Sequence, residues 1–478
     1  MKTNKATSRR SFIKQSAIAF AGISIVPRHV LGQGYTAPSD QLNIAAIGGG
    51  GKGYTDILHA WNEGTSNVAA ICDVDWNMAA NAFKKFKKAK RFKDYRKLLD
   101  QVKDLDAITI STPDHTHAVI AMDAMKRGIH VYVQKPLTHN IYEARMLTEA
   151  ARKYKVVTQM GNQGASGDGV KQMQVWFDEG TIGKVDTVDV WTNRPVWPQG
   201  IPTPQNKPAM LDGLDWDSWI GPAQMVDYHP LYHPFKWRGW WNFGTGALGD
   251  MGCHLIDPPY RVLGLGYPTE VESSVGAIYT RDWVPEYLPE SCPPSSRTQL
   301  KFEASEKNPV AVTMSWTDGG LRPFRPERIP ADHGIGDGNS SNGVIMIGEK
   351  GIMTCGTYGR NPKVYLNTGE VLEHQEVENQ LPEYGHQVSW LAACKEGFGS
   401  EKHKNLTSSF DFSGPLTESV LMGNLAIRSY MNRTPRKGGS FDYPGRKKLL
   451  WDGDNMKVTN FEPANQFVKR TYREGWSL

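Results

Sequence analysis

Short apolar runs alternate with amphipathic stretches through the first third of the chain. Five runs have the composition of buried strands: 42–47, 68–72, 107–111, 130–133 and 156–160. One helical pattern begins at Tyr54. A second follows the turn at 112–117 and ends near Gly128, and a third covers 141–154. Strands and helices that alternate at this spacing predict a parallel, doubly wound sheet. Ligands bind at the carboxyl ends of such strands, so segments 111–117, 134–136 and 161–163 are expected around one cleft.

Past Gly183 the pattern changes, and strand-like runs at 185–192, 310–316 and 343–347 dominate. A chain of 478 residues is too long for one ordinary core, so we expect at least two domains.

The N-terminus carries a separate pattern. Residues 8–14 read SRRSFIK and match the twin-arginine export motif, and the apolar run at 17–26 is too short to span a bilayer. We therefore expect residues 1–34 to be a removable signal that engages the twin-arginine export machinery, with a periplasmic destination and no stable membrane anchor.

The charge balance supports this division. Residues 1–34 hold six of the 55 Lys and Arg and no acid, and the other 49 nearly balance the 50 Asp and Glu. A folded body without net positive charge offers no general attraction to nucleic acid, so no nucleic-acid partner is expected. The five cysteines form no CxxC pair, which argues against a zinc ribbon or a disulfide framework.

A glycine-rich segment follows the first predicted strand. Gly48, Gly50 and Gly53 satisfy G-x-G-x-x-G between that strand and a helix, the context that favours a pyrophosphate-binding turn. Asp73 ends the second strand, twenty residues past Gly53. A carboxylate there can bind the ribose hydroxyls and would repel a 2′-phosphate, so NAD is expected and NADP is disfavoured. Asp75 is a second candidate for this contact.

Five motifs in this order resemble the Gfo/Idh/MocA family, which includes glucose–fructose oxidoreductase and inositol dehydrogenase. They are AAIGGGGKG (45–53), CDVD (72–75), TPDHTH (112–117), QKPL (134–137) and GDMGCH (249–254). The resemblance implies an N-terminal Rossmann domain and a C-terminal α/β domain with a large, mostly antiparallel open sheet. It also implies a homodimer or homotetramer. The expected domains are the signal (1–34), the NAD-binding domain (35–160), the substrate-binding and oligomerisation domain (161–430) and a tail that packs on the body (431–478).

The resemblance also implies the catalytic residues. Lys135 is expected beside the nicotinamide, where its charge stabilises a developing alkoxide or helps to relay a proton. Asp250 and His254 match the family's D-x-x-x-H pair: His254 is expected to be the general acid or base, protonated more readily because of Asp250, which orients it or binds a substrate hydroxyl. Gln134 stands where the family usually has Glu, and it keeps hydrogen bonding without the charge.

The remaining site residues form two expected groups. Besides Asp73, the cofactor is expected to contact Gly48, Gly50, Gly51, Lys52, Gly53, Ser111, Pro113, His115, His117, Gln134 and Lys135. Besides Asp250 and His254, a carbohydrate is expected to contact Asn162, Arg194, Lys236 and Arg238, with Trp197 as a stacking surface. A metal site made of Asp250, Cys253 and His254 is not expected, because Cys253 points to another side of the helix.

Three functions stay open. The first is an exported, NAD-dependent oxidoreductase that acts on a sugar or pyranoside with a tightly bound cofactor. The second is a redox-neutral glycosidase that proceeds by oxidation, elimination, hydration and reduction. The third is a sugar-binding protein without catalysis on the same fold.

Overall fold

The computed structural model describes residues 41–374, 385–437 and 440–478. The predicted signal segment lies outside the described residues. Residues 42–478 are one structural unit, in which two sheets are covered and joined by helices.

The N-terminal half is built on the predicted parallel sheet. Its order is β3-β2-β1-β4-β5-β6, which is the strand order of a doubly wound dinucleotide-binding fold. The strands are β1 (Leu42–Ile47), β2 (Ser66–Cys72), β3 (Lys90–Phe92), β4 (Ala107–Ile110), β5 (His130–Val133) and β6 (Thr158–Met160). The helices are α3 (Lys52–Trp61), α4 (Ala80–Lys85), α5 (Tyr95–Gln101), α6 (Asp114–Lys126) and α7 (Ile141–Tyr154).

The apolar run of β1 is buried on both faces of this sheet. Ala45 and Ile47 join the core under α5, α6 and α7, whereas Ile44 and Ala46 join the core under α3 and α4. Burial on both faces explains why the strand is continuously apolar rather than alternating. Helix α12 (Gly385–Glu396) packs on the second of these cores through Trp390, so by its contacts it belongs to the Rossmann half.

The second half contains a ten-stranded mixed sheet in the order β16-β15-β14-β13-β7-β12-β11-β8-β19-β20. Only the β7–β12 pair is parallel within this described sheet, so the expected mostly antiparallel architecture is confirmed. The strands are β7 (Val185–Thr192), β8 (Glu270–Val275), β11 (Ser296–Phe302), β12 (Val312–Thr317), β13 (Asn342–Gly348), β14 (Gly351–Cys355), β15 (Lys363–Leu366), β16 (Val371–Glu373), β19 (Leu449–Asp452) and β20 (Lys457–Val458).

Four smaller strands and five further helices lie C-terminal to β6 in the chain. The strands form two hairpins, β9 (Tyr279–Arg281) with β10 (Val284–Pro285), and β17 (Thr434–Pro435) with β18 (Phe441–Asp442). The helices are α8 (Asp168–Asp178), α9 (Trp216–Ile220), α10 (Gly246–Leu255), α11 (Asp257–Val262) and α13 (Glu401–Lys404).

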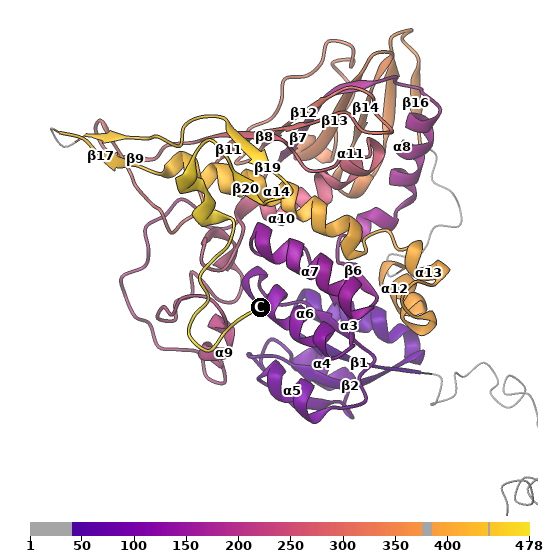
Figure 1. Cartoon of the computed structure of the whole chain (residues 1–478), viewed down its shortest axis with the longest axis vertical. Helices are drawn as coiled ribbons and strands as arrows, with labels where there is room; N and C mark the ends of the chain where they lie inside the picture. Colours follow the sequence, from indigo (N-terminus) through magenta and orange to yellow (C-terminus); the bar gives the residue numbers. More distant parts are fainter. Residues whose placement is uncertain (1–40, 375–384, 438–439) are drawn as a thin grey trace, which may run out of the picture. The chain divides into compact units, whose positions relative to one another are not determined.

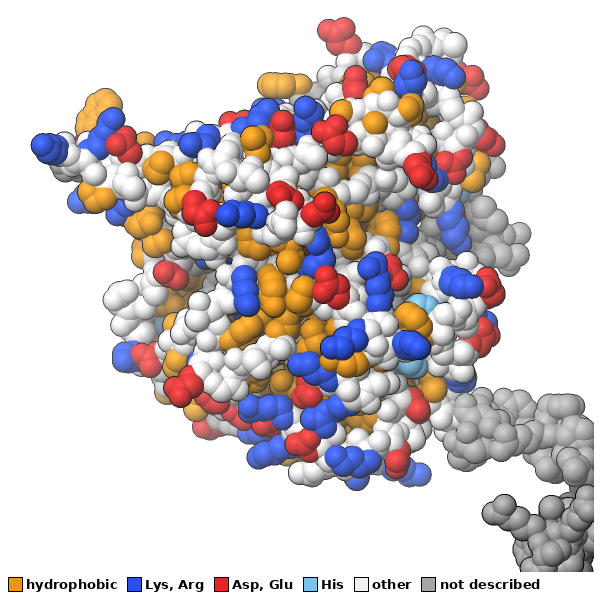
Figure 2. All heavy atoms as spheres, viewed as in Figure 1, with side chains coloured by type: hydrophobic (Ala, Val, Ile, Leu, Met, Phe, Trp, Pro, Cys, Tyr) orange, Lys and Arg blue, Asp and Glu red, His pale blue; other side chains and the backbone are white. Residues whose placement is uncertain are grey.

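One long helix ties the halves together. Helix α14 (Phe410–Met431) packs against α7 of the Rossmann half, against α10, and against β8 and β11 of the mixed sheet (Figure 1). Because α10 carries two predicted catalytic residues, this packing fixes them relative to both sheets. No described helix is both long enough and apolar enough to cross a membrane. On the face in Figure 2, positive and negative side chains are interspersed.

Candidate active site

A cleft of about 650 Å³ lies at the carboxyl ends of the parallel strands. The loops after β1, β2, β4 and β5 line it, together with α10 and the segment 193–245 that connects β7 to α10. The lining includes thirteen of the predicted site residues: Gly48, Gly50, Gly51, Lys52, Asp73, Ser111, Pro113, Gln134, Lys135, Arg194, Arg238, Asp250 and His254. Residues from both halves of the chain therefore share one cleft, as the motifs predict.

The glycine-rich loop after β1 is shaped for close backbone approach. Gly48 has a φ of +86°, and a Cβ there would collide with the carbonyl oxygen of Ser111. Gly53 does not line the cleft, but its Cβ would collide with the carbonyl of Gly48, so glycine is needed for α3 to pack on the loop. Gly51 caps α3, and none of its described neighbours donates a side-chain cap to that helix end. The free N–H groups of α3 fit the pyrophosphate of a dinucleotide.

Asp73 holds this loop at the end of β2. Its Oδ2 accepts hydrogen bonds from the N–H groups of Gly49 (2.8 Å) and Gly50 (3.0 Å). Burial raises the pKa of Asp73, against the lowering effect of its backbone hydrogen bonds. Asp73 also lines the cleft, where it can accept ribose hydroxyls as predicted. The parallel expectation for Asp75 is wrong, because its buried carboxylate accepts His233 Nε2 at 2.9 Å.

A buried carboxylate that the sequence analysis missed lies under the loop. Asp56 of α3 accepts Ser111 Oγ (2.8 Å), Gln134 Nε2 (2.8 Å) and Gln387 Nε2 (3.0 Å), and it pairs with Lys52 Nζ (2.9 Å). Gln134 therefore donates to a carboxylate instead of being one. The sequence did contain a signal for Asp56, because it is an acid on the apolar face of this helix, among residues spaced for burial.

At the other end of the cleft, Lys135 and Asp250 form an ion pair. Lys135 Nζ donates to Asp250 Oδ1 at 2.9 Å and to the Asp250 carbonyl at 2.7 Å. Burial would raise the pKa of Asp250, but Lys135 and Arg238 outweigh burial and lower it to about 2. Asp250 is therefore a carboxylate, and the expectation that it orients His254 is wrong because Lys135 occupies it.

His254 lines the cleft one helical turn after Asp250, with the edge of Tyr358 4.6 Å away between ring centroids. Burial, and then Lys135, lower the pKa of His254 well below its usual value, and Asp250 opposes this only in part. Asp250 therefore favours the protonated form of His254 as expected, but burial and Lys135 outweigh it. A neutral imidazole in this position can accept a proton. Its Nδ1 is buried without a hydrogen-bond partner among the described residues.

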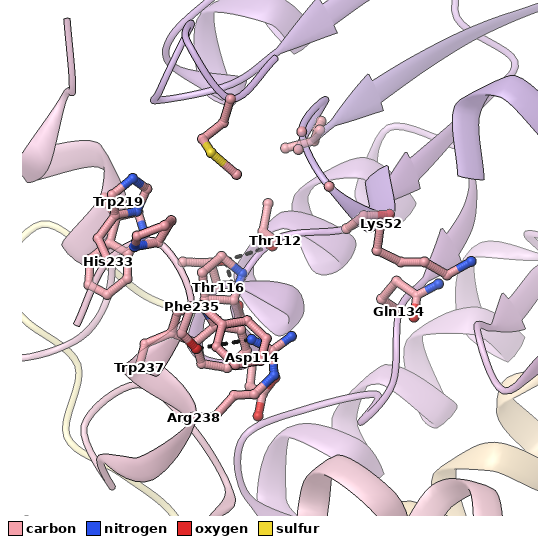
Figure 3. A pocket seen from close by; sticks show the side chains of 18 of the residues that line it. Lys52, Thr112, Asp114, Thr116, Gln134, Trp219, His233, Phe235, Trp237 and Arg238 are labelled. Atoms are coloured by element: carbon pink, nitrogen blue, oxygen red, sulfur yellow. Dashed lines mark hydrogen bonds between the residues drawn. The ribbon is translucent and has the colours of Figure 1, made fainter. Parts of the chain in front are cut away.

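Three further charged side chains surround the Lys135–Asp250 ion pair. Arg194 Nε lies 3.7 Å from Asp250 Oδ2, and Arg238 Nε lies 3.4 Å from Asp250 Oδ1. Asp114, at the start of α6, accepts Thr245 Oγ1 at 2.6 Å, and burial raises its pKa to about 6. Figure 3 shows Arg238 beside Phe235 and Trp237. Asp114 lies within the TPDHTH motif, from which no role was predicted for it.

The two histidines of the TPDHTH motif are not cofactor ligands. Both are completely buried, and neither lines the cleft. His115 Nε2 lies 2.9 Å from the Trp219 carbonyl, and His117 bridges the carbonyls of Thr112 and Pro136 at 2.8 Å each. These predictions are wrong because both rings face the core and hold the loops of the cleft together.

Two predicted substrate contacts also lie elsewhere. Asn162 is fully buried beside Asp257 and does not reach the cleft. Lys236 shares a short 3-10 helix with Arg238, but residues two apart on such a helix point in different directions, and only Arg238 lines the cleft. Trp197 lines it as expected.

Two segments close over the nucleotide end. In the segment 193–245, the Asp215 N–H donates to the Val74 carbonyl at 2.9 Å, beside the His233–Asp75 pair. From the C-terminal tail, Trp476 lines the cleft, 6.2 Å from Tyr95 between ring centroids and 4.7 Å from the Arg96 guanidinium. Arg470 anchors that tail through the fully buried Glu143 at 2.8 Å.

Metal-binding chemistry has no support in the part of the chain that the structure describes, where no cluster of three or more His, Cys, Asp or Glu side chains could hold an ion. The five cysteines are free and buried.

Comparison with known proteins identifies the family. Residues 42–162 match the profile of an oxidoreductase family with an NAD-binding Rossmann fold, and residues 182–280 match the C-terminal α/β domain of the same family. This chain belongs to the Gfo/Idh/MocA family. The first match covers the glycine-rich loop, Asp73 and Lys135, and the second covers Arg194, Arg238, Asp250 and His254. The cofactor expected for this family member is therefore NAD.

Two curated relatives are similar over part of their length. A levoglucosan dehydrogenase of Pseudarthrobacter phenanthrenivorans is 25% identical over 280 residues, which are 57% of this chain and 62% of that protein. An α-N-acetylgalactosaminidase of Shewanella oneidensis is 28% identical over 170 residues, which are 30% of this chain and 37% of that enzyme. A solved levoglucosan dehydrogenase with NADH and L-sorbose shares the fold, with a TM-score of 0.55 and 16% identity over 81% of this chain and 97% of that chain.

Proposed function

We propose that this family member oxidises a ring carbinol of a carbohydrate with a retained NAD. The observation that carries the proposal is the Lys135–Asp250 ion pair, which lines the same cleft as His254 and the glycine-rich loop. Aromatic residues at the cleft, such as Trp197, suit the apolar face of a pyranose ring. A relative named levoglucosan dehydrogenase supports a carbohydrate substrate.

The residues of the cleft have separate roles in cofactor binding and in the oxidation. The uncapped start of α3 and the loop around Gly50 and Gly51 hold the dinucleotide phosphates, and Asp73 holds a ribose. NAD held in this way would supply the hydride acceptor for the carbinol carbon. His254, neutral because of burial, accepts the hydroxyl proton. Lys135, paired with Asp250, stabilises the negative charge that develops on the carbinol oxygen.

Retention of the cofactor follows from the enclosure of the nucleotide end. Segment 193–245 lies against the loop after β2, and Trp476 of the anchored tail lines the cleft beside Tyr95. A dinucleotide held under both segments has to displace them in order to leave, which slows its release. Retention also suits an enzyme that is exported with its cofactor.

The direct test is to denature the purified protein and identify what it releases by mass spectrometry. We expect about one NAD per chain. Incubation of the native protein with pyranosides and no added cofactor should then yield a keto-sugar in amounts limited by the bound NAD. Protein that refolds with added NAD but oxidises no carbohydrate would contradict the proposal.

A redox-neutral glycosidase is the second candidate, favoured by the similarity to the α-N-acetylgalactosaminidase over 170 residues. In that reaction, oxidation of a ring carbinol acidifies the adjacent C–H, the aglycone is eliminated, water adds, and the ketone is reduced back. Catalytic release of aglycone without added NAD would favour the glycosidase. Accumulation of a keto-sugar with the aglycone still attached would favour the dehydrogenase.

Export and assembly are further parts of the proposal. The motif at 8–14 supports export to the periplasm by the twin-arginine route, so replacement of Arg9 and Arg10 by lysine should leave the protein in the cytoplasm, as cell fractionation would detect. For assembly, Glu272 and Arg297 expose polar side chains on the mixed sheet, and this face suits a homodimer or homotetramer. Light scattering of the purified protein measures the state directly.

A further inference from the structure

The charges at the substrate end of the cleft do not balance. Lys135, Arg194 and Arg238 surround Asp250, and Asp114 is the other carboxylate nearby. Even with both carboxylates ionised, the three cations outnumber them. A cleft that is partly shielded from water makes such an excess expensive unless a ligand neutralises it.

Asp250 does not occupy the N–H donors of the two arginines. Lys135 makes the hydrogen bonds to that residue, whereas each arginine approaches it only through Nε at 3.4 Å or more, without a hydrogen bond. Arg238 donates one bond, from Nη1 to the Phe235 carbonyl (3.1 Å), and Arg194 donates one, to the Asn193 side chain. A guanidinium has five N–H donors, so several donors on each lack a partner among the described residues.

The Arg238 guanidinium is also held in place before any ligand arrives. Its centre lies 4.2 Å from the ring centroid of Trp237 and 4.6 Å from that of Phe235. The two side chains and Arg238 are seen together in Figure 3, apart from Lys52 and Gln134 of the nucleotide side. A stacked, planar group that keeps free N–H donors is suited to paired hydrogen bonds with an oxyanion.

We propose that Arg194 and Arg238 bind an oxyanion carried by the sugar, so that the preferred substrate is an acidic carbohydrate with a carboxylate. This inference rests on the proposed function, because it names the substrate class of the same site. The phosphates of NAD do not explain the two arginines, since the uncapped start of α3 and the glycine-rich loop already supply donors for them.

The test compares a methyl hexopyranosiduronate with the matched neutral methyl hexopyranoside. Calorimetry on the NAD-loaded protein gives each Kd, and keto-sugar formation gives kcat and KM. We expect the uronate to bind about 10- to 100-fold more tightly than the neutral sugar, with the advantage in KM and reduced by salt. Sulfate and phosphate esters of the neutral sugar form two more arms, and stronger binding of either ester would replace the carboxylate in the proposal.

Arg238→Gln and Arg194→Gln are the variants, and Arg322→Gln, a change in an exposed loop, is the charge-matched control. Each active-site change should weaken binding of the uronate about 10-fold more than binding of the neutral sugar and so remove most of the preference, while the control keeps the preference. Equal affinity for both sugars in the unaltered protein would overturn the inference. So would equal losses for both sugars in the two variants, provided that NAD content and melting temperature are unchanged.

The anion site and the carbohydrate oxidation can be disproved separately. If the uronate binds through the arginines but no keto-sugar forms, the anion site stands and the oxidation is wrong. If neutral sugars are oxidised and the uronate has no advantage, the oxidation stands and the anion site is wrong.

Discussion

The two ends of the cleft use different kinds of groups. At the nucleotide end, the acidic side chains after β2 bond to the protein itself: Asp73 holds the glycine-rich loop, and Asp75 holds His233. What remains for a ligand there is the side of Asp73 that lines the cleft and the backbone at the uncapped start of α3. At the substrate end, the groups that face the cleft are charged side chains around Asp250.

The difference separates binding from chemistry. Backbone donors on a rigid loop bind a constant ligand and tolerate little change of shape, since even one added Cβ collides. Side-chain charges can be exchanged without rebuilding the loop, so they can decide the reaction and the substrate. Changes at the substrate end should therefore affect turnover and leave NAD in place, whereas changes at the nucleotide end should do the reverse.

The strongest test of this division is Lys135→Ala. We expect kcat to fall about 1,000-fold, because the cation that faces the developing alkoxide is lost. The NAD released on denaturation should stay within about twofold of the original, because the donors for its phosphates are unchanged.

The control is Lys171→Ala, an exposed lysine of α8, which should change neither quantity. Unaltered turnover in Lys135→Ala would favour the third function, a sugar-binding protein without catalysis. Loss of NAD together with turnover would show that the two ends are not independent.

The converse test is Gly53→Ala. The added Cβ meets the Gly48 carbonyl, so the loop has to move, and we expect the Kd for NAD to rise about 100-fold. At saturating NAD, kcat should fall by less than about threefold. Gly266→Ala is the matched control, because its Cβ would meet no atom within 4 Å. Titration of cofactor-stripped protein gives both values, and an unchanged Kd in Gly53→Ala would contradict a shape-limited loop.

The same division explains which parts of the site the sequence could predict. The loop around Gly48 and the start of α3 follow from local chain geometry, so a spacing motif was enough to find them. The partner of Asp75 could not be found this way, because His233 reaches it from 158 positions away, across segment 193–245. Asp250 was found, but its partner was wrong, since residues four apart on a helix were favoured over a distant lysine.

The buried residues of α6 show a second limit. A histidine after a strand end can face the ligand or the core, and the motif that contains His115 and His117 does not distinguish the two. The whole first turn of α6 is buried: His115 packs on Trp219 and Phe243 of segment 193–245, whereas His117 bonds the carbonyls of the loops after β4 and β5. The parallel first sheet and the mostly antiparallel second sheet were predicted correctly, because strand periodicity and the family resemblance agreed.

A third prediction concerns the hydrogen bond between Gln134 and the buried Asp56. Gln134→Glu places a second carboxylate beside the buried Asp56, which now accepts the Gln134 amide at 2.8 Å. The lost hydrogen bond and the like charges should lower the free energy of unfolding by about 2 kcal/mol. Denaturant unfolding measures this, with Gln101→Glu on an exposed helix end as the control. Asp56→Asn in the same chain should restore part of the stability; equal losses in the single and double variants would show that Asp56 is not the cause.

The smallest expected effect is the dependence of stability on pH. Burial lowers the pKa of His115 to about 3 and that of His386 to about 4, below the value of about 6.5 in the unfolded chain. Between these values the unfolded chain binds more protons, so stability is complete above pH 6.5 and is lost as the pH falls toward 4.

Asp114 and Asp318, whose pKa burial raises to about 6, act oppositely, because the native state binds more protons between pH 3.8 and 6. Burial also lowers the pKa of His117, His139 and His254, and it raises the pKa of Asp73, Asp257 and Glu418. The histidines of the unfolded chain take up protons throughout the interval from pH 7 to pH 5, so we expect them to dominate and the melting temperature to fall by a few degrees. A melting temperature that rises over this interval would mean that the buried carboxyls dominate. His386→Gln should flatten the curve.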